Sequence, residues 1–357
     1  MKTKLRKKPR LTAGLLSAIA LMGLAALTFT ACLEESWESF TAFDSEELRP
    51  PRLGKVVGTE GGILEAHFDK AAWIDAGSLA LYPGLVVTGV EDGVPVVKIH
   101  LQEGGQPGHR YTLEASVRDE RGNTCSFLYH FYGHNPRIPR MVINEVALGS
   151  PTTRSYTFVE IALLTAGNMG GVNIFQGTKS HADKSFMFPP FEVAGGDYIL
   201  VHFNTIEAEG EVNETTDKTS ASGKGASATA WDFWLTASGN LSKDNNVISL
   251  YTNPEGELID ALVYTTRRYE AGMKYNGFGT SLMQNKVNEV ISEAGWRTGG
   301  AEPFPEDAFD QTGATTVSRP ICRDSLSRDT NSAADWHVVP TGSQTPGAAN
   351  SNEVYER

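Results

Sequence analysis

Short β-prone runs separated by turn residues are the feature that most restricts what this chain can fold into. Val94–Leu101, Tyr111–Val117 and Cys125–Tyr132 are rich in β-forming residues, with alternating side chains in part, and glycine-containing turns lie between them. Such runs between turns are typical of strands, and glycine supplies the backbone conformations that tight turns need. Outside a short apolar stripe at 281–294, no helical pattern competes. The sequence therefore predicts an all-β fold.

Chain length and a break in the strand pattern predict two domains. The chain has 357 residues, which is too many for one small core. Pro136 and Pro139 disfavour both helix and regular strand pairing, and strand patterning restarts at Met141. We expect two tandem β-sandwiches, at residues 54–135 and 141–350, that fold independently.

One strand and turn in the first domain form a recognisable pattern. Tyr111, Leu113 and Val117 lie along the strand, which leads into the turn 119–123, Asp-Glu-Arg-Gly-Asn, and a closing strand. This pattern resembles bacterial immunoglobulin-like modules. The resemblance implies an immunoglobulin-like β-sandwich for residues 54–135.

A set of motifs spans the second domain from end to end. They are Ile143-Asn144-Glu145, Val159-Glu160-Ile161, Gly256 with Asp260, Asp335-Trp336, and Thr345-Pro346-Gly347 with Asn350. Their order resembles that of lamin tail domains, which are immunoglobulin-like sandwiches also found in exported bacterial proteins. The chain departs from that family in its polar insertions at 204–240 and 265–315, and in the segment 168–172. The resemblance implies an interaction platform and does not identify a ligand.

The N-terminus has the layout of a secretory signal. Six basic and no acidic residues occupy the first ten positions, and no charged residue occurs from Leu11 to Ala31. Small residues precede Cys32 and polar residues follow it. The run Phe29-Thr30-Ala31-Cys32 resembles a bacterial lipoprotein signal, with Phe29 in place of the usual aliphatic residue. The resemblance implies that residues 1–31 are removed and that Cys32 is lipidated.

Two alternatives to lipidation remain open, a plain cleaved signal and an uncleaved anchor. The uncharged run would be about 31 Å long as a helix, which is enough to span a bilayer. All three alternatives export the rest of the chain, and we expect a membrane-anchored lipoprotein at the outer membrane or cell surface. Residues 32–53 would form the tether, ending in the proline-containing stretch 49–52. The net charge of −12 argues against nucleic acid as a partner.

Few residues are candidates for catalysis or metal binding. Glu145 and Glu160 lie on neighbouring expected strands and could act as acid and base, but we expect them to bind backbone or loop groups. His130 and His134 do not fall on a helix, so we expect no zinc site. The oxygen-rich loops 243–246 and 328–331 suit calcium only in part, because they lack the usual spacing of aspartates. No nucleophile or phosphate-binding motif is present, and we expect no enzyme activity and no cofactor.

An aromatic cluster is the one candidate binding site. Trp231, Phe233 and Trp234 could stack on sugars or anchor a partner if they are exposed. Alternatively, they begin a core strand and the tryptophans cover its edge. The preceding segment, 204–230, has almost no apolar side chain, so we expect a mobile, projecting loop that trypsin cuts first.

Two further expectations concern the second domain and the thiols. Residues 281–294 should form a helix capped by Ser281 and stopped by Gly295. Cys125 and Cys322 fall in different domains, so we expect free thiols even though export would permit a disulfide.

These features predict a non-enzymatic lipoprotein of the bacterial cell envelope. It would act as a binding or scaffold module through the loops of its lamin-tail-like sandwich, with the membrane and a protein or carbohydrate ligand as partners. A hydrolase-associated accessory protein and a purely structural envelope spacer are the alternatives.

Overall fold

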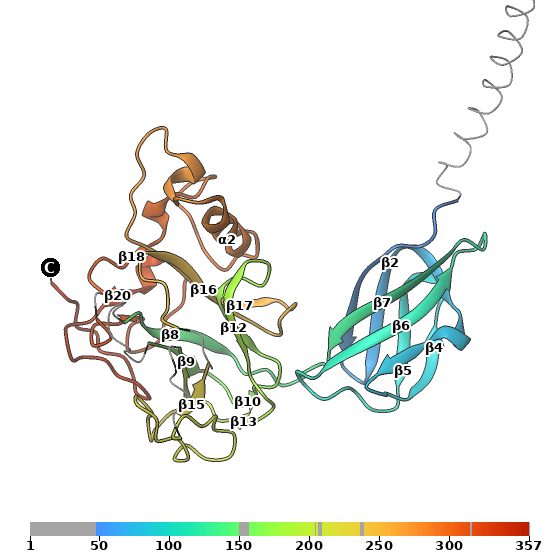
Figure 1. Cartoon of the computed structure of the whole chain (residues 1–357), viewed down its shortest axis with the longest axis horizontal. Coiled ribbons are helices and arrows are strands. Elements are labelled where there is room, and N and C mark those ends of the chain that lie inside the picture. Colours follow the sequence, from blue (N-terminus) through green and yellow to red (C-terminus); the bar gives the residue numbers. More distant parts are fainter. Residues whose placement is uncertain are drawn as a thin grey trace, which may run out of the picture.

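Strands dominate the structure, as the alternating pattern predicts, and the all-β fold is confirmed (Figure 1). Cys32, the expected lipidation site, lies outside the described residues. Within the described part of the chain, no helix is both long and apolar enough to cross a membrane. The computed structural model describes residues 48–149, 157–203, 205, 209–235, 239–314 and 316–356.

The first seven strands form the N-terminal unit, residues 53–132. β2 pairs with β1 and β5 mainly over its first half and with β6 at its end, while β6 also pairs with β3 and β7. Alternate residues of β6, including Tyr111, Leu113 and Val117, point into an apolar core. The strands are β1 (Leu53–Thr59), β2 (Ile63–Ile74), β3 (Ala80–Tyr82), β4 (Val87–Glu91), β5 (Val94–Leu101), β6 (Arg110–Arg118) and β7 (Thr124–Tyr132).

The remaining strands form the C-terminal unit, residues 141–356. A six-stranded sheet has the order β15-β14-β9-β8-β19-β20, and a five-stranded sheet has the order β12-β11-β16-β17-β18. One large apolar cluster draws residues from both sheets, which are therefore the two layers of a sandwich. The strands are β8 (Met141–Ala147), β9 (Phe158–Leu163), β10 (Gly167–Asn168), β11 (Asn173–Gly177), β12 (Ala182–Met187), β13 (Glu192–Val193), β14 (Tyr198–His202), β15 (Trp231–Trp234), β16 (Asn245–Tyr251), β17 (Leu258–Thr265), β18 (Phe309–Asp310), β19 (Ile321–Cys322) and β20 (His337–Val338).

The expected helix is present as α2 (Ser281–Ser292), which packs on the five-stranded sheet. Its N-cap is Thr280 rather than Ser281, because the Thr280 hydroxyl accepts a hydrogen bond from the Met283 amide at 3.1 Å. The buried Lys286 ammonium lies 2.6 Å from an Asp183 oxygen and thereby joins the helix to β12.

The polar segment before β15 differs from the expected projecting loop. In residues 209–230, the Glu214 side chain is 1% exposed and its two oxygens accept hydrogen bonds from the Ala221 and Asp232 amides, each at 2.8 Å. Lys218 forms an ion pair with Asp197 at 2.6 Å. The segment is therefore bonded to the strands, because polar side chains and backbone groups satisfy one another where apolar side chains are scarce.

Candidate functional site

A β-bulge in β8 places Asn144 at the centre of a buried polar cluster. The pairing of β8 with β9 shifts between Ile143 and Glu145, so Asn144 has no partner residue in the ladder. Its side-chain amide donates to Glu160 at 2.8 Å and to the Asn350 oxygen at 3.2 Å. The Asn350 amide in turn donates to the backbone oxygens of Asn144 and Arg323, each at 3.0 Å.

The two candidate carboxylates, Glu145 and Glu160, face each other in the β8–β9 register and are fully buried. Glu145 accepts hydrogen bonds from the Thr345 amide at 3.1 Å and hydroxyl at 3.0 Å. Glu160 accepts one from the Gly347 amide at 2.6 Å. The expectation that both carboxylates bind backbone or loop groups is confirmed, and apart from the Asn144 side chain the groups they bind belong to the closing Thr-Pro-Gly motif.

Burial changes the protonation of this carboxylate pair. It raises the pKa of Glu145 to about 7, against the opposing effect of the two hydrogen bonds from Thr345. Burial, reinforced by the charge of Glu145, also raises the pKa of Glu160 well above its usual range. The neighbouring Cys322 is free and buried, and burial together with the two glutamates raises the pKa of its thiol. A thiol held in its neutral form is a poor nucleophile.

Arg323 completes the cluster, and the sequence analysis missed it. Its guanidinium group is fully buried and binds both oxygens of Asp260, at 2.9 and 3.0 Å. It also lies within 3.3 Å of Asp335 and 4.4 Å from the ring centroid of Trp336. The sequence signal for this buried charge is an arginine directly after the apolar pair Ile321-Cys322. The guanidinium group also donates to the Ile143 backbone oxygen at 2.8 Å, so it joins three of the sequence motifs, those that contain Ile143, Asp260 and Asp335-Trp336.

A second buried polar pair, also missed, lies on the same sheet. His202 Nε2 lies 2.6 Å from an Asp232 oxygen, and both residues are at most 1% exposed. The His202 ring stacks on Trp234 with 4.0 Å between the centroids. His202 continues the apolar run of β14, and Asp232 interrupts an aromatic run in β15. A buried polar residue within such runs is the signal that sequence analysis could have used.

The candidate aromatic binding site is wrong, because its three side chains are buried. Trp231, Phe233 and Trp234 are 9%, 0% and 7% exposed. Trp231 and Phe233 belong to the apolar core, where Phe233 lies 5.1 Å from Phe188 and Phe191 between ring centroids. These side chains cannot stack on a ligand, and the alternative that they form a core strand is the correct one.

The described residues contain no group of three His, Cys, Asp or Glu side chains arranged to hold a metal ion. In one of the two oxygen-rich loops, Asp329 accepts a hydrogen bond from the Asn331 amide at 2.9 Å and lies 3.2 Å from Arg323. His130 bonds to Thr112 across the β6–β7 ladder. Cys125 and Cys322 are both free thiols, as expected.

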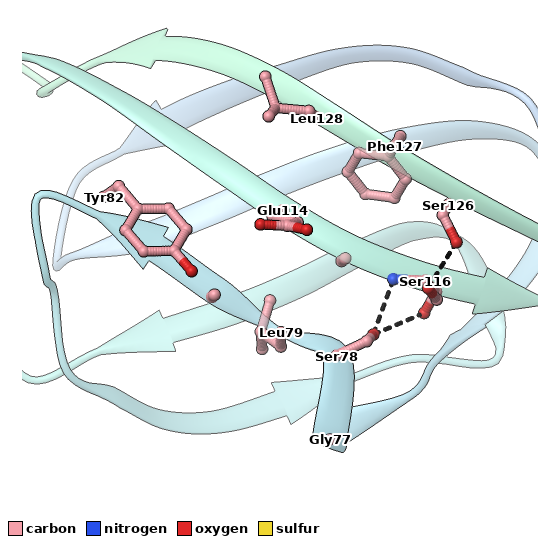
Figure 2. A pocket seen from close by; sticks show the side chains of 11 residues that line it. Gly77, Ser78, Leu79, Tyr82, Glu114, Ser116, Ser126, Phe127 and Leu128 are labelled. Atoms are coloured by element: carbon pink, nitrogen blue, oxygen red, sulfur yellow. Dashed lines mark hydrogen bonds between the residues drawn. The ribbon is translucent and has the colours of Figure 1, made fainter.

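A shallow depression of about 590 Å³ lies on the β3–β6–β7 sheet of the N-terminal unit (Figure 2). Tyr82 and Leu128 are 55% and 60% exposed there, with the exposed Glu114 between them. Hydroxyl groups of Ser78, Ser116 and Ser126 bond to one another or to backbone groups at one side. The depression therefore offers one carboxylate and few free polar groups.

A larger cleft of about 960 Å³ lies between the two units. Its N-terminal wall comprises the β1 residues Lys55 and Val57 together with Tyr129, Tyr132 and His134 on and after β7. Tyr129 and Tyr132 are partly exposed, and β1 and β7 are not paired with each other among the described residues. The wall thus presents aromatic rings beside two strand edges.

The opposite wall comes from the C-terminal unit and is acidic. It contains Glu255 and Glu257, which are exposed on the turn between β16 and β17, and the ion pair of Lys179 with Glu293 at 2.5 Å. The pKa of the Tyr132 hydroxyl is raised, chiefly by burial and further by the charge of Glu255, with Arg110 opposing. The two walls are therefore close enough for their charges to interact.

The floor of the cleft is the linker, which is bonded to the C-terminal unit. The Asn135 side-chain amide donates to the backbone oxygens of Asn168 at 2.7 Å and Gly170 at 2.9 Å. Gly108 approaches Gly171 so closely that a Cβ on Gly108 would lie 2.3 Å from the Gly171 nitrogen. These contacts set the spacing of the two walls.

Comparison with known sequences places a family match on the C-terminal unit. Residues 139–338 match the family TP_1001_2nd, described as "protein second domain". An uncharacterized protein of Treponema pallidum (strain Nichols) is 26% identical over 167 residues, which are 46% of this chain and 42% of that protein. The chain therefore aligns with less than half the length of that relative.

Solved structures show only remote similarity. A DUF4876 family protein from Bacteroides thetaiotaomicron has 13% sequence identity and a TM-score of 0.28, with 84% of this chain and 90% of that chain covered. Dimeric latent PorU from Porphyromonas gingivalis has 12% identity and a TM-score of 0.16, with 57% and 19% covered. TM-scores this low support no argument about function.

Proposed function

We propose, on the premise that this chain belongs to the TP_1001_2nd ("protein second domain") family, that it is a non-enzymatic binding protein of the bacterial cell envelope. In this proposal a lipid on Cys32 anchors the chain to the membrane, residues 32–53 space it from the surface, and a ligand occupies the cleft between the two units. The C-terminal unit is the lamin-tail-like scaffold, whose buried carboxylates hold its own closing segment.

The cleft carries this proposal. At about 960 Å³ it has the size of a ligand-binding site, and it combines aromatic rings with carboxylates that are free to make new contacts. The buried carboxylates, Glu145 and Glu160, are bound by the closing segment of their own unit, which favours a scaffold role over acid–base catalysis.

The ligand site can be tested by filling the cleft. Val57 is 38% exposed and lines the cleft, so Val57→Trp should block it, while Val94→Trp places the same ring on β5, outside the cleft. Hydrogen exchange of the full chain is measured with and without fractionated envelope extract. We expect protection of residues 53–59, 129–134 and 252–258 in the parent chain and in Val94→Trp, and none in Val57→Trp. Protection confined to other segments would contradict the proposed site.

The anchor can be tested separately. Cys32→Ala should move the chain from the detergent phase to the aqueous phase in Triton X-114 partitioning, because the thiol that carries the lipid is lost. Unchanged partitioning would favour an uncleaved membrane helix.

A further inference from the structure

The charges in the cleft are unbalanced. Lys179 is neutralised by Glu293 at 2.5 Å, and its ammonium also donates to the Gly256 oxygen at 2.9 Å. Three other carboxylates line the cleft, on Glu60, Glu255 and Glu257, and one further ammonium group, on Lys55. None of these three glutamates has an ion pair or a side-chain hydrogen bond among the described residues. The three carboxylates outnumber the one unpaired ammonium group, so the cleft lining has an excess of negative charge, although Arg110, outside the lining, acts on Tyr132 in the opposite sense to Glu255.

Aromatic rings lie opposite two of those carboxylates, Glu255 and Glu257. Tyr129 and Tyr132 line the N-terminal wall, and Glu255 is near enough to Tyr132 to raise the pKa of its hydroxyl. A cation beside a tyrosine ring is attracted by the negative face of the ring, and a carboxylate on its other side adds a charge-assisted hydrogen bond. Neutral sugars would gain the ring contact but would leave the excess charge unpaired.

We propose that the cleft binds a basic peptide segment of a partner protein, with arginine or lysine side chains between Tyr132 and the pair Glu255 and Glu257. This inference rests on the proposed function and specifies its ligand. Charge complementarity selects this partner: the chain as a whole has a net charge of −12 and would attract a basic segment, and the cleft then provides a local site for it. β1 and β7, which line the cleft, are each paired with only one strand among the described residues, and such strand edges suit an extended chain rather than a compact one.

The test uses a fluorescein-labelled peptide of alternating arginine and glycine, with glutamine–glycine and glutamate–glycine peptides as controls. Binding to the full chain is measured by fluorescence anisotropy at low and high salt. We expect the arginine peptide alone to bind, with an affinity that falls as salt rises. Glu255→Gln/Glu257→Gln should weaken binding about tenfold or more, because both partners of the cation are lost.

A matched variant separates the cleft from the general acidity of the chain. Glu120→Gln/Glu270→Gln removes the same charge from exposed positions outside the cleft and should leave binding nearly unchanged. Equal weakening in the two double variants would overturn the inference, as would binding of spermidine without binding of the peptide. Binding of chitohexaose that is insensitive to Glu255→Gln/Glu257→Gln would overturn it too, while leaving the cleft as the ligand site. A chain whose cleft gains no protection with any extract would instead overturn the proposed function.

Discussion

The two units differ in the side chains that they bury. Among the strands of the N-terminal unit the buried side chains are apolar, and the one buried carboxylate of its described residues, Asp119, caps a turn. The C-terminal unit, in contrast, buries charged side chains at its centre. Asp119 accepts hydrogen bonds from the Arg121 and Asn123 amides, within four residues of itself, and its more distant partner, Lys70, is partly exposed at 3.4 Å. Arg323 and Glu145, in contrast, bind groups 63 and 200 residues away. Local polar contacts stabilise a turn, but long-range buried contacts make distant segments depend on one another.

Two consequences follow from this difference. An apolar core loses stability gradually, in proportion to the atoms removed. A buried charged cluster loses it abruptly, because each group that remains after one partner is removed is left without solvation. The C-terminal unit should therefore be more sensitive to single substitutions and to pH than the N-terminal unit.

Arg323→Met should have the largest effect. It leaves the fully buried Asp260 without its cation, which costs about 3–5 kcal/mol in comparable sites. Arg118→Met removes an exposed arginine of β6 and should change stability by less than about 0.5 kcal/mol. Urea denaturation followed by segment-resolved hydrogen exchange measures both. If the two variants lose similar stability, the buried charges do not distinguish the units.

The pH response should differ in direction between the units. Burial raises the pKa of Glu145 from 4.5 to about 7, so its contribution to stability is fully present below pH 4.5 and is lost as the pH rises to about 7. This loss is on the order of 3 kcal/mol for the C-terminal unit. Asp119 behaves oppositely: hydrogen bonds, chiefly from Asn123, lower its pKa from 3.8 to about 2, so the N-terminal unit loses stability as the pH falls through that range.

Replacing Glu145 by a neutral residue measures how much this side chain contributes to the dependence of stability on pH. Glu145→Gln should flatten the dependence of C-terminal stability on pH between 4.5 and 7, while Glu114→Gln, on the exposed face in Figure 2, should not. Thermal melting across this pH range, followed by hydrogen exchange, measures the effect. A slope that persists in Glu145→Gln would assign the dependence to other groups.

The smallest expected effect concerns the contact between the units. Gly108 and Gly122 both have positive φ, at 73° and 84°, so an alanine at either position costs about 1–2 kcal/mol of backbone strain. Only at Gly108 would the new Cβ meet the backbone of Gly171, since nothing lies within 4 Å at Gly122. Gly108→Ala should therefore also raise the radius of gyration in small-angle scattering. Identical scattering from both variants would mean that this contact does not set the spacing of the units.

Much of the fold could be predicted because its signals are local. The alternation in β6 and β7 and the glycine turns between strands depend on neighbouring residues, and so does the helix at 281–292. The scaffold role of Glu145 and Glu160 could be predicted from the motif set. The closing contacts to Thr345 and Gly347 could not, because a carboxylate does not reveal which distant amide it will bind.

Other features were hidden because their partners come from separate parts of the chain. The role of Arg323 depends on its ion pair with Asp260, which lies 63 residues away in the sequence. The cleft likewise depends on the turn at 255–257, which faces Tyr132. The segment 209–230 was misjudged because polar composition was equated with lack of packing. Glu214 shows that a buried carboxylate can organise such a segment by accepting backbone hydrogen bonds.

The closing segment binds the buried carboxylates across the whole length of the C-terminal unit. Thr345, Gly347 and Asn350 bind groups on β8 and β9, the first strands of their unit. These hydrogen bonds act as a non-covalent cross-link that ties the closing segment to the sheet. Release of the segment would leave Glu145 buried without a hydrogen-bond donor, so the segment and the sandwich should open together as one cooperative unit.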